Sequence, residues 1–205
     1  MAKDNKKIPL REKKKRKTEH CITHSALLLF EEHGYDSVSI DDIAEASEVS
    51  KSTFYNYFDS KESVLLKLSV NSVNNVREEM AKLPDQDDPV FMIKSSFHFL
   101  IDDIYDWRNV ARESAMISVY NAAAHDVISD LIVDYVDCAQ QKGLFRTDYD
   151  CRTITRSFMG GYYIAIFGLD PDISKQECKN QLDIAFSILL EGVLQNKSNP
   201  KKDPD

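Results

Sequence analysis

The chain has 205 residues, 42% of them hydrophobic and 29% charged, which is the balance of a soluble globular protein. No apolar run approaches the roughly 20 residues that span a bilayer, and no apolar segment follows the basic N-terminus as it would in a secretory signal. These features argue against a membrane protein and lead us to expect a cytoplasmic one.

The charge is divided unevenly along the chain. The formal net charge is −8, yet residues 1–17 hold nine Lys or Arg and only two acids. This segment shows no hydrophobic periodicity, so we predict a basic disordered arm over residues 1–17. Its charge suits attraction to phosphates at one end of an otherwise acidic protein, with a solvated tail as the alternative.

Three helices are predicted after the arm. The first covers about residues 18–33, where apolar side chains recur at helical spacing. Ser39 is expected to cap a second, short helix and Ser50 a third. Two short helices joined by a tight turn, within residues 18–62, form the layout of a helix-turn-helix that reads DNA.

Every later segment also has a helical pattern. A long fourth helix is expected from Asp59 to about Ala81, and an acidic loop follows it. Five further helices are predicted at about residues 88–104, 110–123, 126–142, 150–168 and 174–195. No strand pattern is present in the sequence. The predicted fold is therefore all-α with about nine helices, a three-helix head before a larger bundle at 63–195, and a polar, disordered tail at 196–205.

The third helix offers a short-chained polar side. A major groove about 12 Å wide admits one α-helix, so a reading helix needs small polar side chains toward the bases. Phe54 and Phe58 are expected to pack inward, whereas a purely structural three-helix unit would bury all the aromatic side chains. The residues suited to base edges or phosphates are Lys51, Ser52, Thr53, Tyr55, Asn56, Tyr57 and Lys61.

The chain resembles the TetR family of bacterial transcriptional regulators over about Ala26 to Leu68. The resemblance rests on the order and spacing of Phe30-x3-Gly34-Tyr35, Ser39-Ile40-x2-Ile43-Ala44 and Val49-Ser50-Lys51-Ser52-Thr53-Phe54-Tyr55-x-Tyr57-Phe58-x-x-Lys61-Glu62. It implies an all-helical homodimer with an N-terminal DNA-reading head and a C-terminal domain that binds a ligand and dimerises. It also implies that bases face Lys51, Ser52 and Thr53, and that phosphates are held by Ser39, Tyr55, Tyr57 and Lys61.

Two positions depart from the family pattern. The family usually has glycine in the turn where this chain has Glu48, so we expect Glu48 to adopt a positive φ at a cost of roughly 1 kcal/mol, or the turn to differ slightly. Ser52 stands where glycine is common and adds a hydrogen-bonding group. Neither change breaks the motif.

The segment after the head is rich in aromatic residues, and we expect most of them in an ordinary helical core. The resemblance adds an apolar cavity between helices that holds a small apolar or amphipathic ligand. Candidate wall residues are Phe97, Ile101, Trp107, Met116, Tyr120, Phe158 and Tyr162. Acids near Trp107 would form a solvated face or meet a cationic ligand: Asp102, Asp103, Asp106 and Glu113.

The last two predicted helices are the candidates for dimerisation. An apolar stripe recurs along the final helix, and two adjacent glycines in the preceding helix would permit close helix approach. Paired across a two-fold axis, these helices would form a four-helix interface. Its candidate residues are Gly160, Gly161, Leu182, Ala185, Phe186, Leu189, Leu190 and Val193.

We therefore predict a homodimeric regulator that binds double-stranded DNA, most simply a repressor released from a palindromic operator by a small-molecule ligand. Two alternatives stay open: a family member controlled by protein partners without an inducer, and an all-α lipid-binding or interaction protein with a structural helix-turn-helix. An enzyme, a cofactor and a metal site are not expected, because the five histidines, including the incidental pair His20 and His24, and the four isolated cysteines form no ligand or nucleophile pattern.

Overall fold

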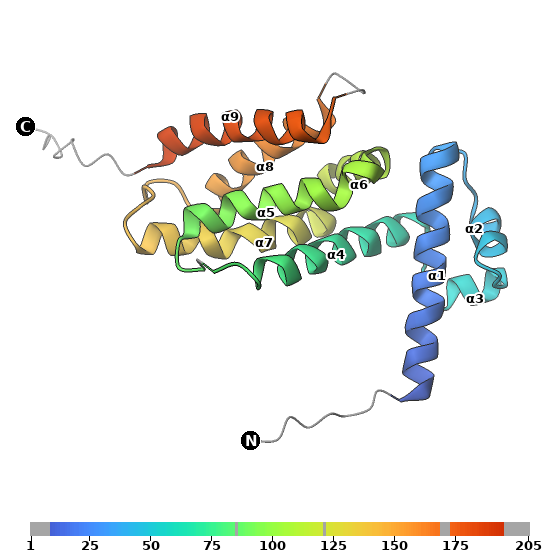
Figure 1. Ribbon diagram of the computed structural model, residues 1–205. Helices are drawn as coiled ribbons and strands as arrows, with labels where there is room; N and C mark the ends of the chain where they lie inside the picture. Colours follow the sequence, from blue (N-terminus) through green and yellow to red (C-terminus); the bar gives the residue numbers. More distant parts are fainter. Residues whose placement is uncertain (1–8, 85, 121, 169–172, 195–205) are drawn as a thin grey trace, which may run out of the picture. The chain divides into compact units, whose positions relative to one another are not determined.

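The computed structural model describes residues 9–84, 86–120, 122–168 and 173–194 of the chain (Figure 1). These residues form nine α-helices and one 3-10 helix, and within them no strand is present beyond an isolated bridge between Phe145 and Leu194. The predicted all-α fold with about nine helices is confirmed. None of the described helices is long and apolar enough to cross a membrane.

The chain divides into two compact units. The first comprises Met1–Leu68 with Asn109–Ser114, and the second comprises Ser69–Arg108 with Ala115–Asp205. Both α4 and α6 contribute residues to each unit. The predicted domain limits, 18–62 and 63–195, stay predictions, and the predicted tail at 196–205 lies outside the described residues.

The first unit is built around α1 (Leu10–His33), with α2 (Ile40–Ala46), α3 (Lys51–Tyr55) and the start of α4 (Lys61–Met80). Short polar caps fix where the two short helices begin. The Ser39 hydroxyl accepts the Asp42 N–H while the Asp42 carboxylate accepts the Ser39 N–H, and Ser50 accepts the Thr53 N–H at 3.0 Å. Both predicted caps are confirmed.

Apolar residues from all four helices form the core of this first unit. Phe54 of α3 is fully buried, as predicted, and Phe58 is 5% exposed. Burying a phenylalanine stabilises a fold by about 1.5–3 kcal/mol, so a five-residue helix is held mainly by its packing rather than by its own propensity. The other buried apolar residues of this unit are Ile22, Ala26, Phe30, Val38, Ile43, Ala44, Val64, Leu65 and Val110.

The first helix begins earlier than predicted. It starts at Leu10 rather than near Thr18, because Pro9 precedes it and its carbonyl accepts the N–H groups of Glu12 and Lys13 at 3.0 Å. Residues 10–17 are therefore helical and not part of a disordered arm. Lys, Arg and Glu have high intrinsic helix propensity, so this segment is helical without a buried face. A prediction that relied on hydrophobic periodicity could not detect such a helix. Residues 1–8 of the predicted arm lie outside the described residues.

The second unit is a helical bundle. It contains the rest of α4, α5 (Pro89–Ile104), η1 (Tyr105–Trp107), α6 (Arg108–Tyr120), α7 (Ala122–Gln141), α8 (Cys151–Phe167) and α9 (Lys175–Val193). Within it α5 lies beside α7 and α9, and α8 lies beside α7 and α9 (Figure 1). Asp88, Asp150 and Ser174 cap α5, α8 and α9 at the positions where these helices were predicted to begin.

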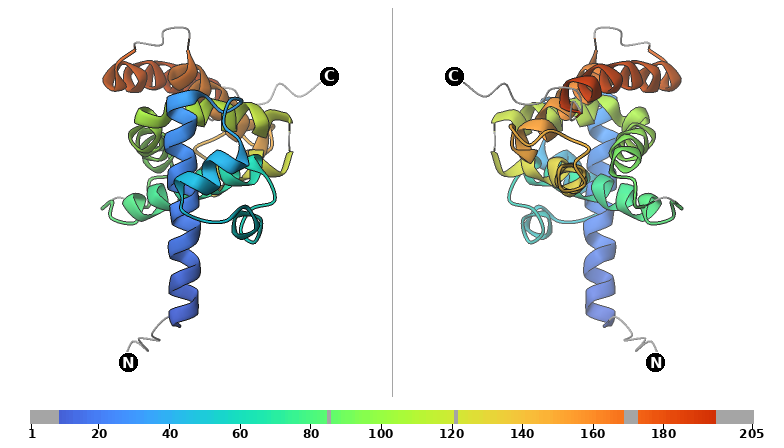
Figure 2. Two further views of the ribbon diagram at one scale, coloured as in Figure 1. Left: turned by 90° about the vertical axis from the view of Figure 1, so that its right-hand side faces the viewer. Right: turned by 90° about the vertical axis from the view of Figure 1, so that its left-hand side faces the viewer.

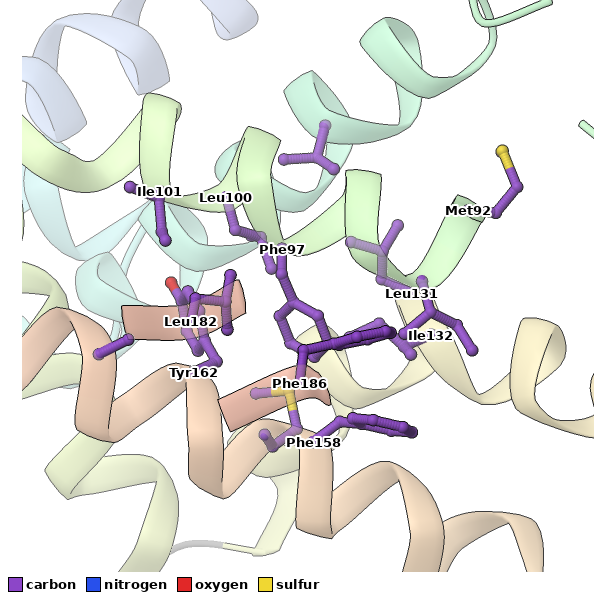
Figure 3. Packing of buried hydrophobic residues seen from close by; sticks show 14 of the residues in the cluster. Met92, Phe97, Leu100, Ile101, Leu131, Ile132, Phe158, Tyr162, Leu182 and Phe186 are labelled. Atoms are coloured by element: carbon purple, nitrogen blue, oxygen red, sulfur yellow. The ribbon is translucent and has the colours of Figure 1, made fainter. Parts of the chain in front are cut away.

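Aromatic side chains fill the interior of the bundle (Figure 3). The rings of Phe97 and Tyr162 stack at 5.5 Å between centroids, and those of Phe158 and Phe186 at 4.9 Å. Burial raises the pKa of the Tyr162 phenol well above its ordinary value, because a phenolate in this interior would lose its hydration. Ring pairs of this kind stabilise by about 0.5–1.5 kcal/mol beyond their buried area.

Candidate nucleic-acid interface

The turn between α2 and α3 is closed by its own backbone and by one buried serine. The Val49 N–H donates to the Ala44 carbonyl at 2.9 Å, and the Ser47 hydroxyl donates to the Ile43 carbonyl at 2.6 Å. Glu48 adopts a φ of 55°, the positive φ that we expected at the position where the family has glycine. Among the described residues it is the sole non-glycine residue with a positive φ. The turn therefore keeps the geometry of a glycine turn.

Replacing Glu48 by glycine should stabilise the first unit. The left-handed conformation costs an ordinary residue about 1 kcal/mol more than it costs glycine, and the larger entropy of glycine in the unfolded chain offsets part of that gain. We expect the midpoint of denaturant unfolding to rise modestly with an unchanged slope. Glu45→Gly, inside α2, is the matched control and should lower the midpoint. A lower midpoint for Glu48→Gly would mean that the Glu48 side chain stabilises the turn.

The predicted base-facing residues share the exposed side of α3. Lys51 and Ser52 are exposed and Thr53 is half-buried. The hydroxyl of Ser50 lies 2.9 Å from that of Ser52 and 2.8 Å from that of Thr53, so the first turn of α3 presents a connected row of hydroxyl groups. Such groups both donate and accept hydrogen bonds, which is the chemistry that base edges require.

One carboxylate lies beside this polar row. The Lys51 ammonium contacts the Asp41 carboxylate of α2 at 2.9 Å, and both side chains are more than half exposed. This contact is the main cause that raises the pKa of Lys51 above its ordinary value. An exposed pair of this kind contributes little to stability. Lys51 is thus a fully charged cation that a phosphate or a guanine can recruit from Asp41.

The two predicted phosphate-binding tyrosines differ in exposure. Tyr55 is 48% exposed, and its ring stands edge-on to the buried Phe54 ring at 5.7 Å between centroids. Tyr57 lies just after α3 and is half-buried. The ring contact anchors the body of Tyr55 and leaves its hydroxyl end accessible, which is the arrangement that a phosphate contact needs.

Lys61 has partners inside the first unit, and its predicted phosphate contact stays a prediction. Its ammonium donates to the carbonyls of Tyr35 at 2.8 Å and Val38 at 2.7 Å, and it lies 4.4 Å from the centre of the Tyr35 ring. Lys61 therefore ties the start of α4 to the segment between α1 and α2. The sequence spacing could not reveal this, because these partners lie 26 and 23 residues away.

Ser39 is also engaged within the first unit. Its hydroxyl donates to the Asp42 carboxylate at 2.6 Å, and its hydrogen bonds to that carboxylate hold the pKa of Asp42 below the usual value. A phosphate at Ser39 would be repelled by this negative charge. We therefore expect a weaker phosphate contact at Ser39 than at Tyr55 or Tyr57.

Four of the predicted pocket-wall residues lie in the buried core of the second unit. At most 2% of the surface is exposed at Phe97, Ile101, Phe158 and Tyr162, which belong to the same core cluster. Protein interiors are closely packed, so large inward side chains fill the space between the helices. Trp107 is half-buried and Met116 is 53% exposed. The side chain of Tyr120 lies outside the described residues.

A cavity of about 350 Å³ lies elsewhere in the second unit, between α4 and α5. Its lining is mixed rather than apolar and consists of Asn75, Val76, Glu78, Glu79, Phe99, Asp102 and Asp103. Three of its four acids already have partners: Asp102 pairs with Lys179 at 2.6 Å, Glu79 pairs with Lys82 at 2.6 Å, and Asp103 accepts from Asn75 at 2.9 Å. No group of three or more potential metal ligands occurs among the described residues.

Three of the predicted dimer residues are buried within the second unit, whereas the dimer interface itself stays a prediction. Leu182, Phe186 and Val193 are at most 9% exposed, since this stripe of α9 packs into its own bundle. The apolar residues that α8 and α9 expose are instead Ile164 at 72%, Ile184 at 62% and Ile188 at 67%. Both stripes of α9 have helical spacing, so periodicity alone could not tell which one faces inward.

The exposed isoleucines form one surface. A Cβ on Gly161 would lie 3.4 Å from both the Ala185 and Leu189 side chains, so α8 and α9 touch along that line. Because each residue advances about 100° around a helix, Ile164 then lies on the same side of the pair as Ile184 and Ile188. Gly160, also on this side, has nothing within 4 Å of an added Cβ. We call Gly160, Ile164, Ile184 and Ile188 the isoleucine face.

Comparison with known proteins places these features in context. Residues 22–68 match the family described as bacterial regulatory proteins, tetR family. The chain is 32% identical over 88 residues to the negative transcriptional regulator IcaR of the biofilm operon icaADBC from Staphylococcus aureus, a match over 42% of this chain and 45% of IcaR. The matched segment thus spans less than half the length of IcaR. It is 23% identical over 208 residues to the HTH-type transcriptional regulator YerO of Bacillus subtilis, covering 93% of this chain and 69% of YerO.

Solved structures show the same fold. The TetR-family repressor FadR of Thermus thermophilus, in complex with lauroyl-CoA, superposes with a TM-score of 0.69 at 23% identity, over 91% of this chain and 99% of FadR. A TetR-family regulator from Syntrophomonas wolfei also reaches 0.69, at 20% identity, over 86% of this chain and 96% of that one.

Proposed function

We propose that this chain, which belongs to the TetR family of bacterial regulatory proteins, is a dimeric transcriptional repressor released from a palindromic DNA operator by a small molecule. The observation that carries the DNA-binding part is the exposed side of α3. There, Lys51, the hydroxyl row of Ser50, Ser52 and Thr53, and Tyr55 surround a helix anchored by the buried Phe54.

The geometry of α3 suits a major groove. A five-residue helix presents few side chains, so its base contacts must come from its first turn, where Lys51, Ser52 and Thr53 lie. Base edges offer donors and acceptors that hydroxyl and ammonium groups match, and Tyr55 adds a phosphate contact that sets the register. Lys61 is left out of this interface, because its ammonium holds the Tyr35 and Val38 carbonyls.

Dimerisation through the isoleucine face supports operator recognition. Three largely exposed isoleucines on α8 and α9 would bury apolar area against a second copy, and the small Gly160 would let the helices approach closely. A two-fold dimer carries two copies of the DNA-reading head, and a palindromic operator offers one half-site to each.

Solved structures of similar fold with bound ligands support the ligand part of the proposal. The structure of FadR contains lauroyl-CoA, and that of RolR, which matches this chain with a TM-score of 0.59 at 21% identity over 94% of this chain and 100% of RolR, contains resorcinol. A ligand that binds better to the conformer with the wrong separation of heads shifts the population away from the DNA-bound form. In this chain the ligand would be a small apolar or amphipathic molecule held in the second unit.

A second candidate is a family member that answers to protein partners without a small-molecule inducer. A screen of acyl, aromatic and cationic compounds for release of the bound operator separates the two. Release by a compound at micromolar concentration supports the first candidate, and release only by a cell protein supports the second.

Alanine substitutions on α3 should separate phosphate contact from base reading. Tyr55→Ala should weaken binding to every duplex by about 10-fold or more, since a hydrogen bond to a charged group contributes about 1.5–3 kcal/mol. Thr53→Ala should relax the preference at a single base pair in each half-site, where a good contact discriminates by about 1–3 kcal/mol. Both are measured by fluorescence anisotropy on the selected operator and its single-base variants.

Tyr149→Ala is the matched control, since Tyr149 is a tyrosine of the second unit with 50% exposure. It should leave DNA binding unchanged. If Tyr55→Ala bound the operator as tightly as the original protein did, the placement of the DNA interface on α3 would be wrong.

A further inference from the structure

The N-terminal two turns of α1 form a highly charged helical segment. From Leu10 to Lys17 there are six Lys or Arg and one Glu, a net charge of +5 over about 12 Å of helix. Every residue in this stretch is exposed, and the buried residues of α1 begin only at Ile22. We call residues 10–17 the basic rod.

The basic rod contributes nothing to the core of the first unit. Figures 1 and 2 show this end of α1 extending past α2 and α3. Its cations lie three and four residues apart and repel one another, and among the described residues the Arg16–Glu12 pair at 2.7 Å offsets this repulsion. Folding therefore gives no reason for this charge. The rod also precedes residues 22–68, the segment that matches the family.

We propose that the basic rod binds the phosphate backbone of the double-stranded DNA that flanks the operator half-site. The inference rests on the proposed function and adds a second contact surface to it. Along its axis the rod carries about one positive charge per 2–3 Å. This linear charge density is close to that of duplex DNA, which carries one negative charge per about 1.7 Å. The length of the rod, about 12 Å, is similar to the width of the major groove, about 12 Å. With α3 in one groove, the rod can therefore reach phosphates beside that groove.

The chemistry of the rod favours a phosphate backbone over other partners. Its charges lie on all sides of the helix, and Leu10 is its one apolar residue, so it lacks the apolar face by which a helix lies in a membrane surface. Lysines reach phosphates as flexible point charges and read no base pattern. The rod is accordingly expected to raise affinity for any flanking sequence and to leave base preference to α3.

The test compares the full-length protein with the triple variant Lys13→Gln, Lys14→Gln, Lys15→Gln. Glutamine keeps the helix propensity and removes the charge. The control variant removes the same charge from the second unit, by Lys82→Gln, Lys94→Gln and Lys142→Gln. The probes are the strongest operator that the original protein selects from a random duplex pool and a 30-base-pair duplex of scrambled sequence. Circular dichroism checks that the helix content is kept.

The readout is the slope of log affinity against log salt concentration. Each phosphate contact contributes about 0.9 to this slope, so the rod variant should lose about 2 to 3 from its magnitude on both duplexes. The ratio of operator to scrambled affinity should stay constant, and the control variant should keep the original slope. When the operator is trimmed to its outermost specific base pair, the difference between the original protein and the rod variant should vanish.

The outcomes separate the rod from the proposed function. An original protein that binds no duplex even at low salt overturns the proposed function itself. An original protein that binds with strong salt dependence, while the rod variant shows the same slope, overturns the rod alone. Loss of base preference in the rod variant, or charge-dependent binding to phosphatidylserine vesicles with an unchanged slope on DNA, also overturns the assignment to flanking DNA.

Discussion

Replacing Ile184 and Ile188 by glutamate should convert the protein into a monomer and lower its operator affinity by about 100-fold or more. When two heads are linked, binding of the first head holds the second close to its half-site. The affinity of the dimer then commonly exceeds that of a single head by about 10²–10⁴-fold, and a monomer loses this gain. The substituted side chains are 62% and 67% exposed, so the change leaves the core of the second unit intact. Each charge would instead face a second charge, or an apolar side chain, across the two-fold axis.

Sedimentation equilibrium gives the mass, and anisotropy gives the operator affinity. Phe91→Glu is the control, because Phe91 is an apolar residue of the second unit with 38% exposure that lies on α5, outside the isoleucine face. The control should stay dimeric and bind normally. A double glutamate variant that still sediments as a dimer would rule out the isoleucine face as the interface. In that case the same experiment should be repeated on α6, whose Met116 is 53% exposed.

Replacing Lys61 by methionine should destabilise the first unit by about 1–3 kcal/mol, because two partly buried carbonyl groups lose a charged donor. The two carbonyls that it serves, of Tyr35 and Val38, lie in the segment that leads from α1 into α2. Operator binding should weaken only in proportion to the fraction unfolded. The salt dependence of binding should stay as it was, because no phosphate contact has been removed.

The measurements are denaturant unfolding and the salt slope of operator binding. Lys67→Met is the matched control on the same helix, since Lys67 pairs with Glu19 at 2.8 Å near the surface. A surface ion pair contributes about 0–1 kcal/mol, so this control should cost less. If Lys61→Met kept the original stability and the slope fell by about 0.9, Lys61 would be a phosphate contact after all.

The local features of the head could be predicted well from the sequence. Ser39 and Ser50 cap their helices through contacts three residues away, and Glu48 adopts its positive φ because the chain has no glycine at that turn. Phe54 is buried because it is the apolar residue on a short polar helix. These outcomes depend on neighbours close in sequence, so a linear pattern contains the information needed.

The basic rod shows a limit of the same reasoning. Periodicity detects a helix by the apolar face that it buries, and residues 10–17 bury nothing. Their helix follows instead from intrinsic propensity, from the Pro9 carbonyl and from continuity with the packed part of α1. An absent apolar stripe therefore shows that a segment has no core contact, and it does not show that the segment is disordered.

By itself, the sequence determined the all-α class, the helix caps, the strained turn at Glu48 and the exposed polar side of α3. Only the tertiary structure decided which apolar stripe of α9 faces inward, that Phe97 and Tyr162 stack in the core, and that Lys61 holds two carbonyls. The physical reason is the range of the interactions. Caps and turns form between residues a few positions apart, whereas the facing of a stripe and the partner of a charge depend on groups brought together only when the helices pack.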